Sequence, residues 1–270
     1  MNIGFIGTGN MSKQIITGLL NKNFPHENIF CSAKHFDTLK IFTEQHHLVA
    51  LENNIEVVKA ADLIFIAVHP ETASEVLAEI APFVNPEEQT IISLMTGLTL
   101  EQLAGWIGPV KLVRIMPNLN VAVNLGSIAY CFNAELDSED QKEVLELLQL
   151  LGSTYPLAEK DFSTFVALAG SSPAFVYMFI DALARSAVKY GLPKDLATTI
   201  AAEVVAGSGV LAKNSGKIPW QLVDEVSSPG GSTVAGVFSL EEHGFINAIQ
   251  QAFQATVEKD SGPSTKYPKN

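Results

Sequence analysis

The sequence predicts an α/β fold in which a doubly wound, Rossmann-type sheet at the N-terminus is followed by an all-helical C-terminal domain. Over residues 1–160, short apolar runs alternate with helical patterns, and a glycine-bearing turn joins the first run to the first helix. After residue 160 the alternation stops, and long apolar helices follow. We therefore predict a sheet domain over residues 1–160, a helical domain over residues 161–258 and a flexible tail over residues 259–270.

The composition is that of a globular protein and restricts the possible partners. The chain has 270 residues, of which 47% are hydrophobic and 17% charged, so it can bury two cores. A net charge of -12 argues against nucleic acid and anionic membrane surfaces, because phosphate groups demand a basic face. Two cysteines and the lack of a leader pattern predict the cytoplasm. The uncharged run from Phe162 to Ile180 predicts core, with Ser171, Ser172 and Pro173 breaking it into two pieces too short for a membrane span.

The first element is a strand over Asn2–Ile6 that runs into a glycine turn and then a helix. Gly7 allows the tight turn, Gly9 lets the backbone approach a pyrophosphate, and Ser12 stands where the third glycine of a dinucleotide-binding motif would lie. The motif alone also fits a purely structural turn. Its position between strand and helix favours a cofactor site formed by Ile6, Gly7, Thr8, Gly9, Asn10 and Met11.

The second strand, Asn28–Ser32, ends where the adenosine ribose of a bound dinucleotide would lie. An NAD site usually has an acidic residue there, whereas this chain has Ser32 followed by Lys34. A small polar residue and a cation favour the 2′-phosphate of NADPH, with NADH as the alternative. Lys34 can equally be a solvated charge before a helix.

Three further strands predict a parallel sheet whose turns meet at one edge. They are Asp62–Val68, Thr90–Leu94 and Val110–Ile115, and each is closed by a turn at the carboxyl edge, where a nicotinamide ring binds in doubly wound folds. Helices over Glu71–Ala81, Leu100–Trp106 and Ser138–Leu151 complete the alternation.

The helical part predicts a shared hydrophobic surface. The helices Ser172–Tyr190 and Asp195–Lys213 are apolar around most of their circumference, so each must be covered. We expect an intertwined homodimer, the alternative being that these helices pack on the sheet of the first domain. Helices over Ser232–Glu242 and Phe245–Glu258 follow, and no metal-ligand cluster stands out.

The stretch Asp224–Phe238 contains a polar glycine turn that opens into a helix. Exposed N–H groups at a helix start suit a carboxylate, especially beside hydroxyl groups. The candidate anion-binding residues are Ser228, Gly230, Gly231, Ser232 and Thr233. An ordinary capped helix after a tight turn is the alternative.

Three blocks together resemble the pyrroline-5-carboxylate reductase family. They are GFIGTGNM at Gly4–Met11, GSSPAF at Gly170–Phe175 and VSSPGGST at Val226–Thr233, in the order and at the spacing of that family. The resemblance implies a homodimer and permits a larger ring of dimers. It also implies that Asn54 lies near the adenosine ribose, and that the nicotinamide end is lined by Ala67, Val68, His69, Pro70, Met95, Thr96 and Gly97.

The implied reaction is hydride transfer from NAD(P)H to the C=N bond of 1-pyrroline-5-carboxylate, which gives L-proline in the last step of proline biosynthesis. In this interpretation the Ser228 hydroxyl and the amides of Gly231, Ser232 and Thr233 hold the substrate carboxylate. Thr233 is the candidate catalytic residue, because its hydroxyl can bond the ring nitrogen. A protonated imine is already electrophilic, so positioning needs no metal.

Two departures from the family pattern keep other interpretations open. The chain has AVHP where the family commonly has AVKP, and MPNLN where it has MPNTP, so His69 and Asn120 are unusual. A non-catalytic NADP-binding regulatory protein is one alternative. A related imine reductase is another, as is a hydroxyacid dehydrogenase, although the helix from Ser172 has no lysine before Lys189 to serve as the base of the latter.

Overall fold

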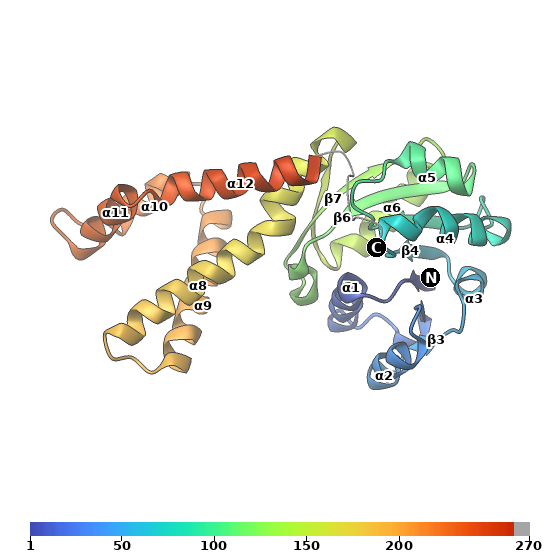
Figure 1. Cartoon of the computed structure of the whole chain (residues 1–270), viewed down its shortest axis with the longest axis horizontal. Coiled ribbons are helices and arrows are strands. Elements are labelled where there is room, and N and C mark those ends of the chain that lie inside the picture. The colour runs from blue at the N-terminus through green and yellow to red at the C-terminus, as the bar shows by residue number, and fades with distance from the viewer. Residues whose placement is uncertain (262–270) are drawn as a thin grey trace, which may run out of the picture. The chain divides into compact units, whose positions relative to one another are not determined.

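The computed structural model describes residues 1–261, which form two compact units (Figure 1). The sheet unit comprises Met1–Gly170 together with residues 259–261, and the helical unit comprises Ser171–Glu258. The predicted division after residue 160 falls within a short 3-10 turn, η5 (Glu159–Asp161). The predicted α/β sheet and the helical C-terminal part are both present.

The sheet has eight strands in the order β3-β2-β1-β4-β5-β6-β7-β8. The first six strands are parallel; β7 is antiparallel to β6, and β8 is parallel to β7. This is the doubly wound order with two added strands. The strands are β1 (Ile3–Ile6), β2 (Ile29–Ser32), β3 (Val49–Ala50), β4 (Leu63–Ile66), β5 (Thr90–Ser93), β6 (Lys111–Met116), β7 (Gly126–Phe132) and β8 (Gly152–Pro156).

Helices cover both faces of the sheet. One face packs against α1 (Asn10–Asn21), α2 (Phe36–His46) and α6 (Ser138–Gln149), and the other against α3 (Asn54–Ala60), α4 (Ala73–Ile80) and α5 (Leu100–Ile107). Alternate strand residues therefore enter different cores: Phe5 and Phe65 stack at 4.8 Å on the first face, whereas Ile64 and Ile66 point to the second. Burial on both faces explains why the central strands are continuous apolar runs.

Some elements were not predicted. Strand β3 is too short to show a pattern, and β7 and β8 begin with glycine and are only partly buried. Helices α2, α3 and α10 (Pro219–Glu225) were also missed, because few of their residues are buried. Short turns complete the path at η1 (His26–Asn28), η2 (Pro70–Thr72), η3 (Ala81–Phe83) and η4 (Leu119–Val123).

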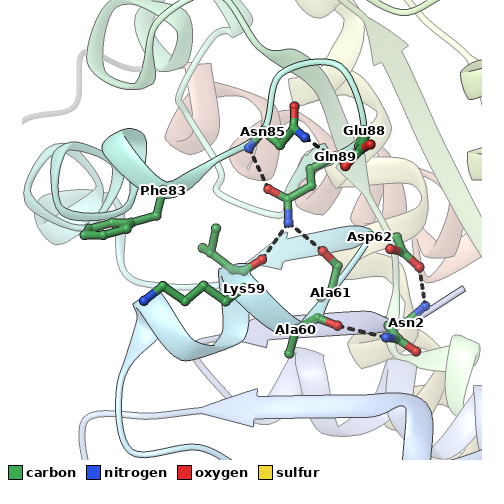
Figure 2. Close-up of a pocket in the computed structure, with 10 residues that line it drawn as sticks. Asn2, Lys59, Ala60, Ala61, Asp62, Phe83, Asn85, Glu88 and Gln89 are labelled. Atoms are coloured by element: carbon green, nitrogen blue, oxygen red, sulfur yellow. Dashed lines mark hydrogen bonds between the residues drawn. The ribbon is translucent and has the colours of Figure 1, made fainter.

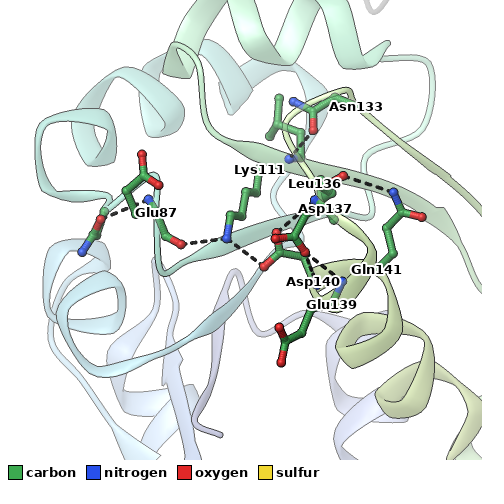
Figure 3. A network of polar contacts seen from close by, with 10 residues as sticks. Glu87, Lys111, Asn133, Leu136, Asp137, Glu139, Asp140 and Gln141 are labelled. Atoms are coloured by element: carbon green, nitrogen blue, oxygen red, sulfur yellow. Dashed lines mark hydrogen bonds and ion pairs between the residues drawn. The ribbon is translucent and has the colours of Figure 1, made fainter.

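A polar network fastens the start of β6 to α6 (Figure 3). The Lys111 ammonium donates to the Asp140 carboxylate and to the Glu87 carbonyl, each at 2.7 Å. Asp137 caps α6 by accepting from the N–H groups of Asp140 and Glu139, and these bonds lower the pKa of Asp137. The hydrogen bond to Asp140 raises the pKa of Lys111. The charged forms of Lys111 and Asp137 are therefore both stabilised in the folded protein.

The chain leaves the sheet through a continuous helical stretch, so the predicted interruption at Ser171–Pro173 is wrong. Helix α7 (Phe162–Phe165) runs into a π-helical turn, η6 (Val166–Ser171), and then into α8 (Ser172–Lys189). Pro173 has no N–H for the carbonyl four residues before it, that of Ala169. The buried Asn118 amide donates to this carbonyl at 3.1 Å and accepts from Ser127 N at 3.1 Å. A side chain thus replaces a lost helical bond.

A second buried polar contact fixes the start of this stretch. Arg114 of β6 is 5% exposed and donates through Nη1 to Glu159 at 2.9 Å. Glu159 also accepts from Leu100 N, and the guanidinium lies 4.4 Å from the centre of the Phe162 ring. Because the Arg114 guanidinium is paired with Glu159 and stacked on Phe162, its charge can remain buried.

The helical unit consists of α8, α9 (Lys194–Asn214), α10, α11 (Ser232–Glu242) and α12 (Phe245–Ser261) as far as Glu258. By length and composition alone, the stretches Glu159–Lys189 and Lys194–Asn214 could each cross a membrane, and only 17% and 11% of their apolar windows are buried within the chain. Core helices of other proteins pass the same test. Helix α12 includes residues 259–261, where the tail was predicted to begin; residues 262–270 of that predicted tail lie outside the described residues.

Candidate functional site

The turn between β1 and α1 requires glycine at its first position. Gly7 has φ of +89°, and a Cβ there would lie 2.6 Å from the Ala67 carbonyl oxygen. Gly7 N donates to Ser32 O at 3.1 Å, and Ser12 Oγ donates to Gly7 O at 2.7 Å. Ser12 therefore links the turn to α1 through its side chain, which a glycine at this position could not do.

Gly9 leaves the start of α1 accessible to an anion. It is the N-cap of α1, no side chain caps the helix, and the first turn carries no acidic residue. A Cβ on Gly9 would meet nothing within 4 Å, so open space lies in front of the helix start. The partial positive charge of the helix N-terminus, with backbone amides at Asn10 and Met11, fits a pyrophosphate group. Thr8 anchors the turn by donating to Ser32 O at 3.0 Å.

The end of β2 is joined to two other elements by a chain of hydrogen bonds. Ser32 Oγ donates to Asn54 Oδ1 at 2.8 Å, and Asn54 Nδ2 donates to Glu79 Oε2 of α4 at 3.0 Å. Ser32 is 1% exposed, whereas Lys34 in the following loop is exposed. The structure thus brings the predicted Ser32 and Asn54 together. Glu79 was not predicted as part of the site, because it lies on a helix 25 positions from Asn54 in the chain.

The turns after β4 and β5 lie at the same edge as the glycine turn. Ala67 N donates to Ile6 O at 2.9 Å, which holds the residues after β4 beside the end of β1. Since β4 and β5 are paired in register, the predicted segments Ala67–Pro70 and Met95–Gly97 follow neighbouring strands. They present partly buried Val68, exposed His69 and Thr96, and Gly97 with φ of +78°; Met95 is buried.

The carboxyl edge of the sheet unit therefore suits an extended dinucleotide. A glycine turn with an uncapped helix offers backbone amides to a pyrophosphate, polar groups lie at the end of β2, and two turns follow β4 and β5. The described residues contain no group of three or more His, Cys, Asp or Glu that could hold a metal ion.

The helical unit contains the second glycine turn, before α11. Gly230 has φ of +70°, and Gly231 is the N-cap of α11, with its N–H donating to Ser228 O at 2.9 Å. No side chain caps this helix and its first turn, Ser232 and Thr233 included, carries no acidic group. Three hydroxyl-bearing residues, Ser228, Ser232 and Thr233, are exposed around this helix start. Backbone amides and hydroxyls together make a cradle for a carboxylate.

A cavity of about 390 Å³ lies at the opposite edge of the sheet (Figure 2). It is lined by residues that precede strands, such as Asn2 before β1, Asp62 before β4 and Gln89 before β5. Gln89 Nε2 donates to the carbonyls of Val58 and Ala61. Since the glycine turn lies at the carboxyl ends of the strands, this cavity is not part of the candidate dinucleotide site.

Comparisons with known proteins cover both units. A family model described as pyrroline-5-carboxylate reductase dimerisation matches residues 159–262, and one described as NADP oxidoreductase, coenzyme F420-dependent, matches residues 2–97. The first match contains both long apolar helices. Their exposed faces are thus accounted for by a dimerisation domain, which supports a homodimer.

Similar proteins match over nearly their whole length. The pyrroline-5-carboxylate reductase of Escherichia coli K12 is 38% identical over 95% of this chain and 96% of its own. The crystal structure of 1-pyrroline-5-carboxylate reductase from Streptococcus pyogenes, at 37% identity, covers 97% of this chain and 99% of its own with a TM-score of 0.86. The Plasmodium falciparum pyrroline carboxylate reductase with NADP bound, at 32% identity, covers 96% and 97% with a TM-score of 0.86. The chain therefore belongs to the pyrroline-5-carboxylate reductase family.

Proposed function

We propose that this chain reduces the C=N bond of 1-pyrroline-5-carboxylate with NADPH to give L-proline, the last step of proline biosynthesis. The observation that carries the proposal is the start of α11 at Gly231, an uncapped helix surrounded by hydroxyls. In an enzyme of this family, this cradle suits the carboxylate group that the substrate and the product both carry.

The coenzyme is assigned to the carboxyl edge of the sheet unit. The amides from Ile6 to Met11 hold the pyrophosphate, with Gly7 and Gly9 allowing close approach. Ser32, Lys34 and Asn54 lie at the adenosine ribose, and the segments Ala67–Pro70 and Met95–Gly97 at the nicotinamide. The coenzyme supplies the hydride when bound. NADPH is favoured over NADH because Lys34 is exposed next to the end of β2.

The substrate is assigned to the glycine turn of the helical unit. The Ser228 hydroxyl and the amides of Gly231, Ser232 and Thr233 hold its carboxylate, and Gly230 gives the turn its shape through its positive φ. Thr233 Oγ1 is exposed in the first turn of α11 and bonds the ring nitrogen. Orientation of an already electrophilic imine is the main contribution of these residues.

The assembly and compartment follow from the same assignment. Residues 161–258 form the substrate-binding and dimerisation domain, and residues 1–160 the coenzyme domain. The family resemblance also permits a larger ring of dimers. The enzyme works in the cytoplasm, where its two free cysteines stay reduced.

The decisive test is coenzyme oxidation with 1-pyrroline-5-carboxylate, followed by loss of NADPH absorbance. The assay is repeated with NADH and with the six-membered piperideine-2-carboxylate. Saturable turnover with NADPH and the five-membered imine supports the proposal. NADPH binding without turnover on either imine would instead indicate a regulatory, non-catalytic protein.

A further inference from the structure

The chain of hydrogen bonds at the end of β2 has a fixed direction. A carboxylate only accepts hydrogen bonds, so the atom of Asn54 that faces Glu79 must be its NH₂ group. The Asn54 oxygen therefore faces Ser32, and the Ser32 hydroxyl must donate its one proton to it. Glu79 thus sets the orientation of the whole chain, although it is the member furthest from β2.

This orientation decides what Asn54 offers to a coenzyme. Its oxygen is occupied by Ser32 and one of its two N–H bonds by Glu79, so one N–H remains. Ser32 is 1% exposed and donates its proton inward. The half-buried Asn54 amide and the exposed Glu79 carboxylate are therefore the members of the chain that an incoming ribose can meet.

We infer that Glu79 is a specificity-determining residue that weakens binding of NADPH relative to NADH, through a carboxylate held beside the 2′ position by Asn54. The inference rests on the proposed function, which places the adenosine ribose at this end of β2. Two acceptors bound to the two N–H bonds of one NH₂ group lie about 5 Å apart. A 2′-phosphate on the free N–H would therefore stand about that far from the Glu79 carboxylate, and like charges repel at this range.

A 2′-hydroxyl meets the same group without this cost. It is neutral, and it can donate a hydrogen bond to a carboxylate, as ribose hydroxyls do in NAD sites where the acidic residue ends β2. Here β2 ends in Ser32, and the carboxylate comes from α4 instead. The acidic group that the sequence lacks at this position is thus supplied by another element.

The charged side chains near the end of β2 do not neutralise the Glu79 carboxylate. Among the described residues, Lys34 and Glu79 form no ion pair, so Lys34 does not neutralise the carboxylate. Glu56, on the same helix as Asn54, accepts from Glu52 N at 3.2 Å. Lys34 attracts a 2′-phosphate and Glu79 repels it, so the two residues have opposite effects on the same ratio of affinities.

The test is the dissociation constant of each coenzyme, measured by coenzyme fluorescence for the wild type and for Glu79→Gln. Glutamine can still accept from Asn54, so the variant removes the charge and keeps the hydrogen bond. We expect NADPH to bind about three- to tenfold more tightly to the variant, the size of the repulsion between exposed charges at this distance in water. The NADH constant should stay within about twofold. Glu101→Gln, which removes an equal charge from the exposed start of α5, is the matched control and should change neither constant.

A second variant separates charge from position. Glu79→Asp keeps the charge on a shorter side chain, so NADPH should not gain affinity. The inference is wrong if Glu79→Gln leaves the ratio of the two constants unchanged, or if Glu101→Gln changes it equally. Wild-type protein that bound neither coenzyme would instead contradict the proposed function, and the inference with it.

Discussion

The two units of the chain differ in what they bury. The sheet unit encloses large side chains completely on both faces of its sheet, such as Phe5 and Phe65 on one face and Ile64 and Ile66 on the other. The buried cluster between α8 and α9 in the helical unit consists of Ala184, Ala197 and Ala201, while many larger apolar residues of these helices are exposed. The sheet unit therefore has a complete core within one chain, whereas the helical unit obtains its cover from a second chain.

The two glycine turns show the same contrast. The turn at Gly7 is tied to β2 and α1 by hydrogen bonds from Gly7 N and Ser12 Oγ, and close contact with Ala67 leaves no room for a side chain. The turn at Gly230 has open space around the glycine and is held by the bond from Gly231 to Ser228. The first turn is therefore held rigidly by its own chain, whereas the glycine of the second turn has fewer contacts within the chain.

The largest expected effect is on assembly. Met178 on α8 is 73% exposed and Ile41 on α2 is 69% exposed. Met178→Lys places a charge on the surface assigned to the partner, so we expect at least a hundredfold weaker dimer and a comparable loss of activity. Ile41→Lys, an equal change on the sheet unit, should leave both unchanged. Sedimentation velocity measures the dimer, and an unaffected Met178→Lys dimer would place the interface elsewhere.

The second effect is on catalysis in the helical unit. Thr233→Ala removes the hydroxyl assigned to the ring nitrogen, a contact worth about 1–3 kcal/mol, so kcat/KM should fall about ten- to a hundredfold. Thr233→Ser keeps a hydroxyl and should retain most of the activity. Wild-type turnover by Thr233→Ala would exclude this residue from the reaction.

The third pair of variants separates fold from binding in the first turn. A Cβ on Gly9 meets no protein atom, so Gly9→Ala should fold normally but weaken NADPH by about tenfold or more, because the methyl enters the space of the pyrophosphate. Gly7→Ala must adopt φ of +89° against Ala67, so it should lower the unfolding free energy by about 1–3 kcal/mol. Denaturant unfolding and coenzyme titration distinguish the two. Equal losses of stability would contradict the rigid-turn interpretation.

The smallest effect concerns the connection between sheet and helix. Asn118→Leu leaves the buried Ala169 carbonyl and Ser127 N–H without this partner, which should cost about 1–3 kcal/mol of unfolding free energy. Asn120→Ala, in the same loop, is the control, because Asn120 is only partly buried whereas Asn118 is buried. Urea denaturation of both variants measures the difference.

The sequence predicted the elements whose burial follows a simple period. Strands such as Leu63–Ile66 and helices such as Asn10–Asn21 have an apolar pattern that matches their burial. Strand β3, with two residues, has no such pattern. The continuous helix through Pro173 could not be foreseen either, because the substitute donor Asn118 lies far away in the chain. Glu79 was missed for the same reason: its partner Asn54 is 25 positions away, on another helix.

The reversed direction of β7 has a consequence for chain routing. Because β7 and β8 run opposite to the other strands, β8 ends at the amino edge of the sheet. The helical stretch of α7 and η6 then runs back towards the carboxyl edge. This stretch brings Ala169 into contact with Asn118, which follows the carboxyl end of β6. If β7 and β8 ran parallel to the other strands, the same helical stretch would instead end at the amino edge of the sheet. The last residues of the sheet unit, Ala169 and Gly170, therefore lie towards the edge that carries the Gly7 turn.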